Sequence, residues 1–526
     1  MNQHTLILSP EKAYDAEQRY RVVKRSIDAR QRALKVHLTV LTDEQGNPLP
    51  KDAPIPLYEP PVFQDVHHAK HSAAIIGAGP AGLFAALTLL EHGIKPIIYE
   101  RGKPVSERKK DIAILNRNQG LNAESNYCFG EGGAGTFSDG KLYSRSKKRG
   151  NMQRVMELFH HFGANDTILY EAHAHIGSDR LPSIIRAMRE CIIEHGGEVH
   201  FDTCVDESLF RNLIANSQYP IGGTPSNSPL GRPLLGVILA IGHSAHDTYQ
   251  MLLDSGVALA NKGFAMGVRV EHPQALINKL MYHDPSPELI RLVGNASYSL
   301  VTQVQGRGVY SFCMCPGGHI VPAGSDARGC VVNGMSASHR NSPFANSGMV
   351  VEIRPEDLLQ YPIGGTPSNS QYSQTDLLAG LRFQQELERL AFEHGSAPSI
   401  APAQRLRDFV EGRKSSTLLA CSYLPGVRSS SMHEWLPEHI GKRLQQGFRD
   451  FDRKYRGFLT NEAVILGVES RSSSAVRIPR DPDTLQSIST PHLYPCGEGA
   501  GYAGGITSSA LDGINAALKI AESIIR

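Results

Sequence analysis

The stretch that decides the fold is SAAIIGAGPAGLFAALTLLEHGIKPIIYERG, from Ser72 to Gly102. It is typical of a strand, a glycine-rich turn, a helix and a second strand that ends in an acid. In the turn, Gly77 permits the tight bend, Gly79 admits a pyrophosphate, and Gly82 lets the helix pack closely on the strand. The helix predicted to begin near Pro80 directs its free N–H groups at phosphates, and Glu100 can accept hydrogen bonds from a ribose. The segment therefore predicts a site for a diphosphate nucleotide.

The surroundings of the glycines favour binding over a tight turn that binds nothing. An apolar strand precedes the turn, an Ala/Leu-rich helix follows it, and Glu100 stands 23 residues after Gly77. The acid is expected about 20 residues on. Residues 73–90 also form an uncharged run of 18 residues, but three glycines and a proline within its first ten residues argue against a membrane span.

Length and charge limit the class of protein. A chain of 526 residues predicts two to four domains at about 150 residues each. The net charge of +2 gives no electrostatic reason to expect nucleic acid or an anionic membrane, so a small-molecule substrate is the expected partner. The N-terminus lacks the basic start and apolar run of a signal peptide, which favours a cytoplasmic location.

Four segments are predicted along the chain, giving an α/β protein whose Rossmann-like nucleotide domain is interrupted by a mixed α+β substrate domain. Residues 1–66 are predicted to form a small α/β appendage with a strand, helix, strand pattern around VVKRSIDARQRALKVHLTVLT. We interpret its basic residues Lys24, Arg25, Arg30 and Arg32 as a solvated helix face, with docking on a partner or a phosphate as the alternative. Residues 70–260 and 461–526 are the two parts of the nucleotide domain, and residues 261–460 the inserted domain. The sequence QYPIGGTPSNS occurs at 218–228 and again at 360–370, and we interpret both copies as loop insertions.

The C-terminal segment LYPCGEGAGYAGGITSSALDGINAALKIAESIIR is a second strand, glycine turn and helix. Together with the first motif it resembles the glutathione-reductase-like family of FAD-binding flavoproteins. Over nearly the full chain, the runs FGEGGAGTFSDGKL, SFCMCPGGHIV, GVESRSSSAVRI and YPCGEGAGYAGGI resemble the bacterial family known as uncharacterised FAD-dependent dehydrogenases.

The resemblance implies roles for particular residues. Glu498 would bind the ribitol of FAD, the N–H groups of Gly504, Gly505 and Ile506 would face the flavin, and the glycine loop 129–142 would pass under its ring. Arg108 would lie near the phosphates, and the backbone of Val205 would pair with the adenine. The positions assigned to FAD are Gly77, Ala78, Gly79, Pro80, Ala81, Gly82, Glu100, Arg101, Arg108, Gly132, Gly133, Ala134, Gly135, Thr136, Val205, Gly242, Gly497, Glu498, Gly504, Gly505 and Ile506.

A flavin in this fold takes a hydride at N5 and passes electrons to an acceptor, so the predicted function is that of an FAD-dependent oxidoreductase acting on a small molecule. NAD(P)H is a possible electron donor, although no second nucleotide fingerprint is visible. The paired cysteines of a disulfide reductase are missing after the first acidic strand. The alternatives are a flavin monooxygenase, whose usual Asp-Gly motif is not seen, and a non-catalytic nucleotide-binding module.

The eight cysteines show no CxxC pairing, so neither a disulfide framework nor a metal site is predicted. Strand alternation would place Cys313 and Cys315 on one face, with Cα atoms about 6.5 Å apart. Three interpretations remain open for this pair: packing, contact with substrate or flavin, and a redox dithiol.

Several charged and polar residues are candidates for the catalysis. Lys141 and Asp139 lie near the presumed flavin loop, and Glu469 with Arg471 would form a charged clamp for an acidic substrate. The full set of candidates is Asp139, Lys141, His243, Cys313, Cys315, His319, Glu469 and Arg471.

Overall fold

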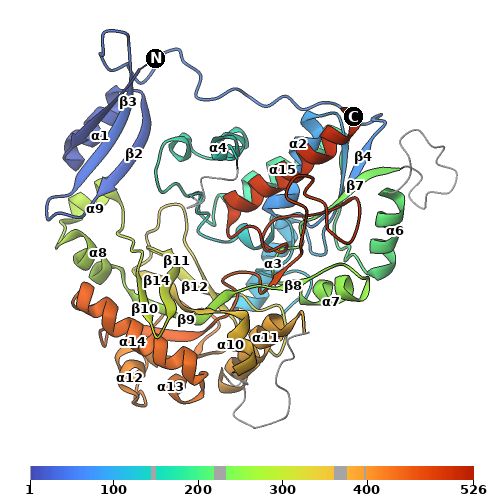
Figure 1. The fold of residues 1–526 in the computed structure, drawn as a ribbon. Coiled ribbons are helices and arrows are strands. Elements are labelled where there is room, and N and C mark those ends of the chain that lie inside the picture. The colour runs from blue at the N-terminus through green and yellow to red at the C-terminus, as the bar shows by residue number, and fades with distance from the viewer. Residues whose placement is uncertain (1, 144–149, 218–232, 361–375, 396–398, 526) are drawn as a thin grey trace.

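The computed structural model describes residues 2–143, 150–217, 233–360, 376–395 and 399–525. Within these ranges the chain forms an N-terminal lobe, a region built on a parallel sheet and a region built on a larger mixed sheet (Figure 1). The first copy of the QYPIGGTPSNS repeat and all but Gln360 of the second lie outside the described residues.

The N-terminal lobe is a three-stranded antiparallel sheet with one helix: β1 (Asn2–Leu8), α1 (Pro10–Arg19), β2 (Val22–Asp28) and β3 (Lys35–Thr42), in the strand order β1-β3-β2. The helix lies before β2, so the prediction of a helix carrying the basic residues between the strands was wrong. Arg25 lies on β2 and is mostly buried, with ion pairs to Glu17 at 2.7 Å and to Glu171 at 3.0 Å. Its role is to dock the lobe onto the nucleotide region.

The parallel sheet has the strand order β19-β7-β4-β5-β6. Its elements are β4 (Ser72–Ile76), α2 (Pro80–Glu91), β5 (Lys95–Tyr99), α3 (Val105–Asn116), η1 (Gly133–Gly135), α4 (Met152–His161), η2 (Asp166–Leu169), α5 (Leu181–Glu194), β6 (Glu198–His200), α6 (Glu207–Ser217), β7 (Leu234–Leu239), α7 (His246–Asp254), β19 (Leu493–Pro495) and α15 (Ile506–Ile525). The strand, helix and strand predicted from residues 72–100 are confirmed.

Alternation along β4 separates two apolar layers. Ala73 and Ile75 pack into the core that contains α2, α5 and α15, whereas Ala74 and Ile76 face the core that contains α6 and α7. Because successive side chains of a strand point to opposite faces, an all-apolar strand indicates a sheet covered by helices on both sides. Figure 1 shows α15, at the red end of the chain, lying across α2.

The mixed sheet has the strand order β10-β11-β14-β9-β17-β15-β16. Its elements and their neighbours are β8 (Ala260–Asn261), β9 (Phe264–Pro273), α8 (Gln274–Tyr282), α9 (Pro287–Val293), β10 (Val301–Val304), β11 (Arg307–Cys315), β12 (His319–Pro322), β13 (Val332–Met335), β14 (Phe344–Ile353), α10 (Pro355–Gln360), α11 (Ala379–Gly395), β15 (Ala401–Arg405), α12 (Leu406–Glu411), β16 (Val427–Ser429), α13 (Met432–Trp435), α14 (Glu438–Lys454), β17 (Val464–Glu469) and β18 (Val476–Arg477). The boundary expected at residue 460 is corrected, because β17 pairs with β9 and β15 inside this sheet.

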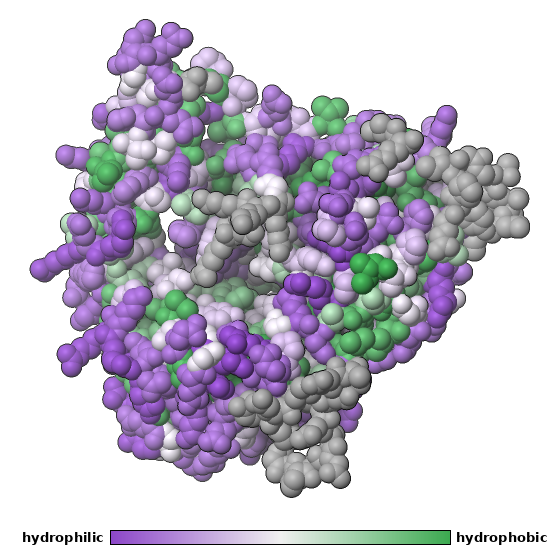
Figure 2. Space-filling model, in the orientation of Figure 1, coloured by the Kyte–Doolittle hydropathy of each residue, from purple (hydrophilic) through white to green (hydrophobic). Residues whose placement is uncertain are grey.

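Hydrophilic residues cover most of the face shown in Figure 2, and apolar residues there form separate groups. Among the helices of the described ranges, none combines the length and apolar character that crossing a membrane requires.

Gly82→Ala is expected to destabilise the nucleotide region. A Cβ at Gly82 would lie 1.9 Å from the carbonyl oxygen of Gly77, so α2 would have to move away from the turn. Overpacking of this kind costs about 1–3 kcal/mol and should lower the apparent Tm by several degrees in thermal unfolding. Gly441→Ala in α14 is the matched control, because its Cβ would meet nothing closer than 3.7 Å; an equal loss in both variants would contradict the interpretation.

Candidate cofactor and active site

The early and late glycine turns meet in space. A Cβ at Gly513 of α15 would lie 2.0 Å from the carbonyl oxygen of Ala81 in α2, so the two helices are in backbone contact. Gly135 lies between the two turns: its Cβ position is 3.1 Å from Ile506 and 3.6 Å from Pro80. Three segments far apart in the sequence therefore form one glycine-lined site.

The N-terminus of α2 is left without a protein cap. Gly79 occupies the N-cap position, no side chain accepts from the first turn, and that turn carries no acid. Its free N–H groups and the positive end of the helix dipole favour an anion. The predicted tight turn is confirmed at Gly77, whose φ is +104° and whose Cβ position is 2.4 Å from the oxygen of Ala240.

Glu100 lies under the same turn and is almost fully buried. Its carboxylate accepts backbone N–H groups from Ala78 at 2.8 Å, Gly102 at 2.9 Å and Gly130 at 3.0 Å. A carboxylate offers about four acceptor positions, so one is left for the predicted ribose hydroxyl. The acid thus also holds the nucleotide turn and the loop after it in register.

The loop 129–136 lies directly over the first turn. The Gly132 N–H donates to the carbonyl of Ala78 at 2.8 Å, and a Cβ at Gly133 would lie 3.1 Å from the Cα of Gly79. Arg108 holds this loop from below: its guanidinium is fully buried and donates to the carbonyls of residues 126, 127, 130 and 131 and to Thr136 Oγ1. Burial lowers the pKa of Arg108 to about 10. Because the protein already uses the donors of the Arg108 guanidinium, this arrangement favours a role for Arg108 in positioning the loop.

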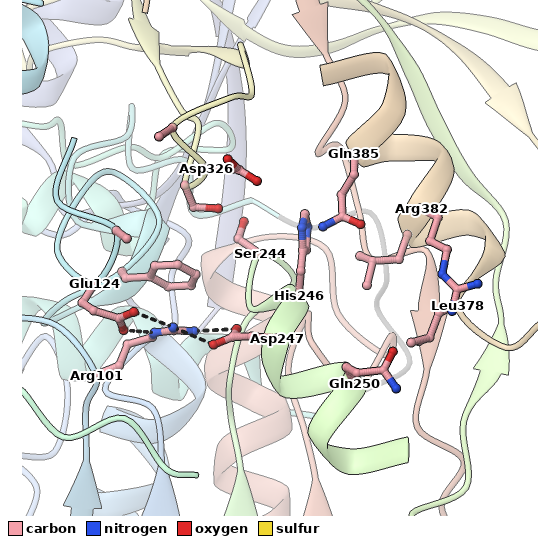
Figure 3. Close-up of a pocket in the computed structure, with 15 residues that line it drawn as sticks. Arg101, Glu124, Ser244, His246, Asp247, Gln250, Asp326, Leu378, Arg382 and Gln385 are labelled. Carbon is pink, nitrogen blue, oxygen red and sulfur yellow. Dashed lines mark hydrogen bonds and ion pairs between the residues drawn. The ribbon is translucent and has the colours of Figure 1, made fainter. Parts of the chain in front are cut away.

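A cavity of about 550 Å³ opens beside the nucleotide turn, between α7 and α11 (Figure 3). Its lining residues are Arg101, Ala123, Glu124, Phe129, Ser244, His246, Asp247, Gln250, Ser325, Asp326, Ala327, Leu378, Leu381, Arg382 and Gln385. Arg101 spans one wall, with ion pairs to Glu124 at 2.7 Å and to Asp247 at 2.8 Å, and lies over the ring of Phe129. In the described part of the chain, the buried Nε2 of His246 has no hydrogen-bond partner, and burial lowers the pKa of His246 to about 4.

Glu498 and His243, which the sequence assigns to different roles, form one pair. The Nδ1 of His243 lies 2.8 Å from Glu498, and its Nε2 lies 2.9 Å from the carbonyl oxygen of Arg471. The carbonyl can only accept, so Nε2 carries a proton. Burial would raise the pKa of Glu498, but the hydrogen bond and charge of His243, the Gly505 N–H and Lys262 together outweigh it, so the net shift is downward. Both ring nitrogens of His243 are therefore engaged, and the ring is held between Glu498 and the segment that carries Arg471.

The N–H groups predicted to face the flavin are partly occupied. The Gly505 N–H donates to Glu498, and the Gly504 N–H lies 3.1 Å from Ser508 Oγ. Gly504 and Gly505 are exposed, however, and no atom lies within 4 Å of a Cβ built on either. A Cβ built on the half-buried Gly242 also meets no atom within 4 Å, whereas Val205 is buried in the core on the other face of the sheet.

A second cluster gathers four catalytic candidates. The Nζ of Lys141 donates to the carbonyl of Met314, between Cys313 and Cys315, and lies 3.9 Å from Asp139. Burial would lower the pKa of Lys141, but Cys315, Cys313 and Asp139 raise it. Asp139 is buried and paired with Arg340 at 2.6 Å, which lowers the pKa of Asp139 against the effect of burial.

The clamp predicted from Glu469 and Arg471 was wrong. Glu469 pairs with Arg269 at 2.8 Å, while Arg471 pairs with Glu388 at 2.8 Å, and all four side chains are buried. Glu469 ends β17 and Arg471 follows two positions later, beyond the strand, and each faces a different partner. His319 lies exposed at the start of β12, paired through its backbone with Met335.

Sequence reasoning missed the partners Arg269, Arg340 and Glu388. No periodicity or motif marks them, because each comes from a separate element and becomes notable only through its buried ion pair.

Known proteins can now be compared with this geometry. A family model described as "FAD-dependent protein, C-terminal domain-like" matches residues 263–472. A Clostridium beijerinckii protein, described only as uncharacterised, is 39% identical over 519 residues, covering 96% of this chain and 92% of that protein. This chain belongs to that family of FAD-dependent proteins. The family's cofactor, and that of this chain, is FAD.

Solved structures resemble the chain only distantly. CtdE in complex with FAD is 10% identical, covers 86% of this chain and 84% of its own, and has a TM-score of 0.29. A flavoprotein/dehydrogenase from Cytophaga hutchinsonii is 12% identical, with coverages of 86% and 77% and a TM-score of 0.31. Scores this low carry no argument, so the glutathione-reductase-like subtype stays a prediction.

The residues of this family member fit FAD on two observations. The uncapped helix α2 offers N–H groups where a diphosphate needs them. Gly504, Gly505 and Gly242 leave open space beside the turns, with no atom within 4 Å of a built Cβ. A bulky ligand requires open space of this kind.

Proposed function

We propose that this protein is an FAD-dependent oxidoreductase that transfers a hydride between bound flavin and a small-molecule substrate. The observation that carries the proposal is the meeting of the turns at Gly79, Gly135 and Gly505 around one open, glycine-lined site. When bound there, FAD supplies the two-electron chemistry.

In this proposal, separate elements of the chain bind separate parts of FAD. The N-terminus of α2 binds the diphosphate, Glu100 holds the adenosine ribose, and the cavity beside Arg101 receives the adenine end. The N-terminus of α15 directs its dipole at the pyrimidine side of the flavin, which favours negative charge on that ring.

His243 and Glu498 form a fixed pair beside the predicted ribitol position. The Nδ1 of His243 contacts Glu498, and its Nε2 is held by the carbonyl of Arg471. The pair is thus oriented before any ligand arrives. The ammonium of Lys141, which donates to the Met314 carbonyl, contributes a second fixed proton donor in this proposal.

His243→Leu is expected to weaken FAD binding by about 10-fold or more, because a hydrogen bond to a charged group contributes about 1.5–3 kcal/mol. Titration of the apoprotein with FAD, followed by flavin fluorescence, measures the effect. His243→Gln keeps one hydrogen-bond donor, so its FAD affinity should lie between those of wild type and His243→Leu. His319→Leu, at an exposed position, is the control; equal weakening by both leucine variants would contradict the assignment.

The function itself is tested by anaerobic reduction. Purified holoprotein should carry about one FAD per chain, and a panel of NADH, NADPH and small metabolites should contain a compound that bleaches the flavin band. Product that forms only with oxygen would favour the monooxygenase alternative. A purified protein that takes up no FAD would favour the non-catalytic binding module and overturn the proposal.

A further inference from the structure

Cys313 and Cys315 lie at a break in the sheet and not in regular strand geometry. The pairing of β11 with β14 shifts register between Phe312 and Cys315, and Cys313 has a φ of +44°, in the left-handed region. A bulge bends the strand and re-aims its side chains. The Cys315 thiol consequently reaches the Cys313 carbonyl at 3.3 Å and hydrogen-bonds the Cys313 sulfur.

Two cations converge on this bulge. The Nζ of Lys141 donates to the Met314 carbonyl, and Arg269 Nη1 lies 3.3 Å from the Cys313 carbonyl. The anionic groups nearby, Asp139 and Glu469, are each already paired with an arginine. Positive charge beside a thiol favours the thiolate, which is the nucleophilic form.

The two thiols differ in access and in protonation. Cys315 is fully buried, while Cys313 is partly exposed. The hydrogen bond from Cys315 is the largest factor that lowers the pKa of Cys313, with Lys141 and Arg269 adding to it against burial and Asp139. The pKa of Cys315 is raised by the same hydrogen bond and by burial. One thiol of the pair is thus suited to attack and the other to resolve.

The other cysteines whose pKa shifts are resolved lie in different surroundings. Burial raises the pKa of each, and they are Cys191, Cys204, Cys330, Cys421 and Cys496. Cys204 is the exposed member of this set. Comparing its reactivity with that of Cys313 therefore shows whether exposure alone makes a thiol react.

We propose that Cys313 and Cys315 form a reactive dithiol that reduces disulfides, with Cys313 as the attacking and Cys315 as the resolving residue. The Cys313 thiolate attacks one sulfur of a disulfide X–S–S–X, forming Cys313–S–S–X and expelling X–S⁻. The Cys315 thiol then attacks the Cys313 sulfur, gives up its proton to a released thiolate and expels the second X–S⁻. Two cysteines are oxidised to one intramolecular disulfide, and one external disulfide is reduced to two thiols.

The test uses the FAD-loaded protein and oxidised glutathione at pH 7, with peptide mass spectrometry as the readout. Wild type should lose two thiols, form a 313–315 disulfide and retain no glutathione there. Cys315→Ser should instead trap one glutathione on Cys313. A mixed disulfide on Cys204 with both cysteines of the pair left reduced would overturn the proposal.

A second measurement needs no variant. Limited alkylation of the native protein with iodoacetamide should modify Cys313 at least about 10-fold faster than Cys204, because rate follows thiolate character more than exposure. Faster alkylation of Cys204 would contradict the assignment. FAD content is recorded in every sample, so a negative thiol result with normal FAD leaves the proposed oxidoreductase function standing.

Discussion

Gly79→Val is expected to give a folded protein that carries no FAD. Gly79 has φ −75° and ψ −174°, an extended conformation that valine adopts readily, and its Cβ position meets nothing closer than Gly133 Cα at 3.9 Å. The backbone therefore tolerates the substitution. The two added methyl groups, however, point into the open space at the N-terminus of α2, where the diphosphate is placed.

FAD content should fall from about one per chain to below about 0.1, because a packed backbone cannot move away from the methyl groups. Absorbance of the purified protein measures this, and circular dichroism and apoprotein Tm should match those of wild-type apoprotein. Gly77→Val is the contrasting variant: its φ of +104° and a Cβ 2.4 Å from the Ala240 oxygen predict loss of folding as well. Normal FAD content in the Gly79 variant would mean that the turn does not bind the cofactor.

Arg269→Met is expected to cause a large loss of stability in the region of the mixed sheet. Arg269 is fully buried, pairs with Glu469 at 2.8 Å, and donates to Asn346 and Asn333 at 2.7 and 3.0 Å. Methionine fills much of the volume but leaves a buried carboxylate without its cation. Breaking a buried pair in this way costs about 3–5 kcal/mol, measurable as a large fall in the unfolding midpoint.

The loss should depend on pH. Burial raises the pKa of Glu469 above its ordinary value even with Arg269 present, since burial outweighs the attraction of the arginine. Removing Arg269 raises that pKa further. Between the unfolded and folded pKa values the folded state binds a proton that the unfolded chain does not, so stability rises as pH falls. The variant should therefore be closer to wild type at about pH 5 than at about pH 8.

Arg269→Met/Glu469→Leu is the matched control. Replacing both partners by apolar residues removes the unpaired charge, so much of the lost stability and the pH dependence specific to the single variant should disappear. A single variant as stable as wild type at pH 8 would contradict the importance given to this ion pair.

The sequence and the structure agree where the decisive property is local. A glycine spacing, a helix with no capping side chain and a strand of apolar residues each follow from a few neighbouring residues. The interpretation of residues 22–42 failed because β-branched residues in a hairpin and a basic stretch were read as including a helix, while the true helix, Pro10–Arg19, lies before them. The boundary at 460 failed because β17 belongs to a sheet assembled from strands about 200 residues earlier.

By itself, the sequence determined the nucleotide turn, the parallel strands around it and the closing glycine turn, because φ above zero, missing Cβ atoms and strand alternation are properties of short segments. Only the tertiary structure decided the partners of the charged and reactive groups. Glu469 pairs with Arg269 and not with Arg471, His243 pairs with Glu498, and Lys141 donates to the Met314 carbonyl between the two cysteines. These choices depend on which distant side chains share a buried, low-dielectric space, where an unpaired charge is too costly to persist, and no spacing along the chain encodes that.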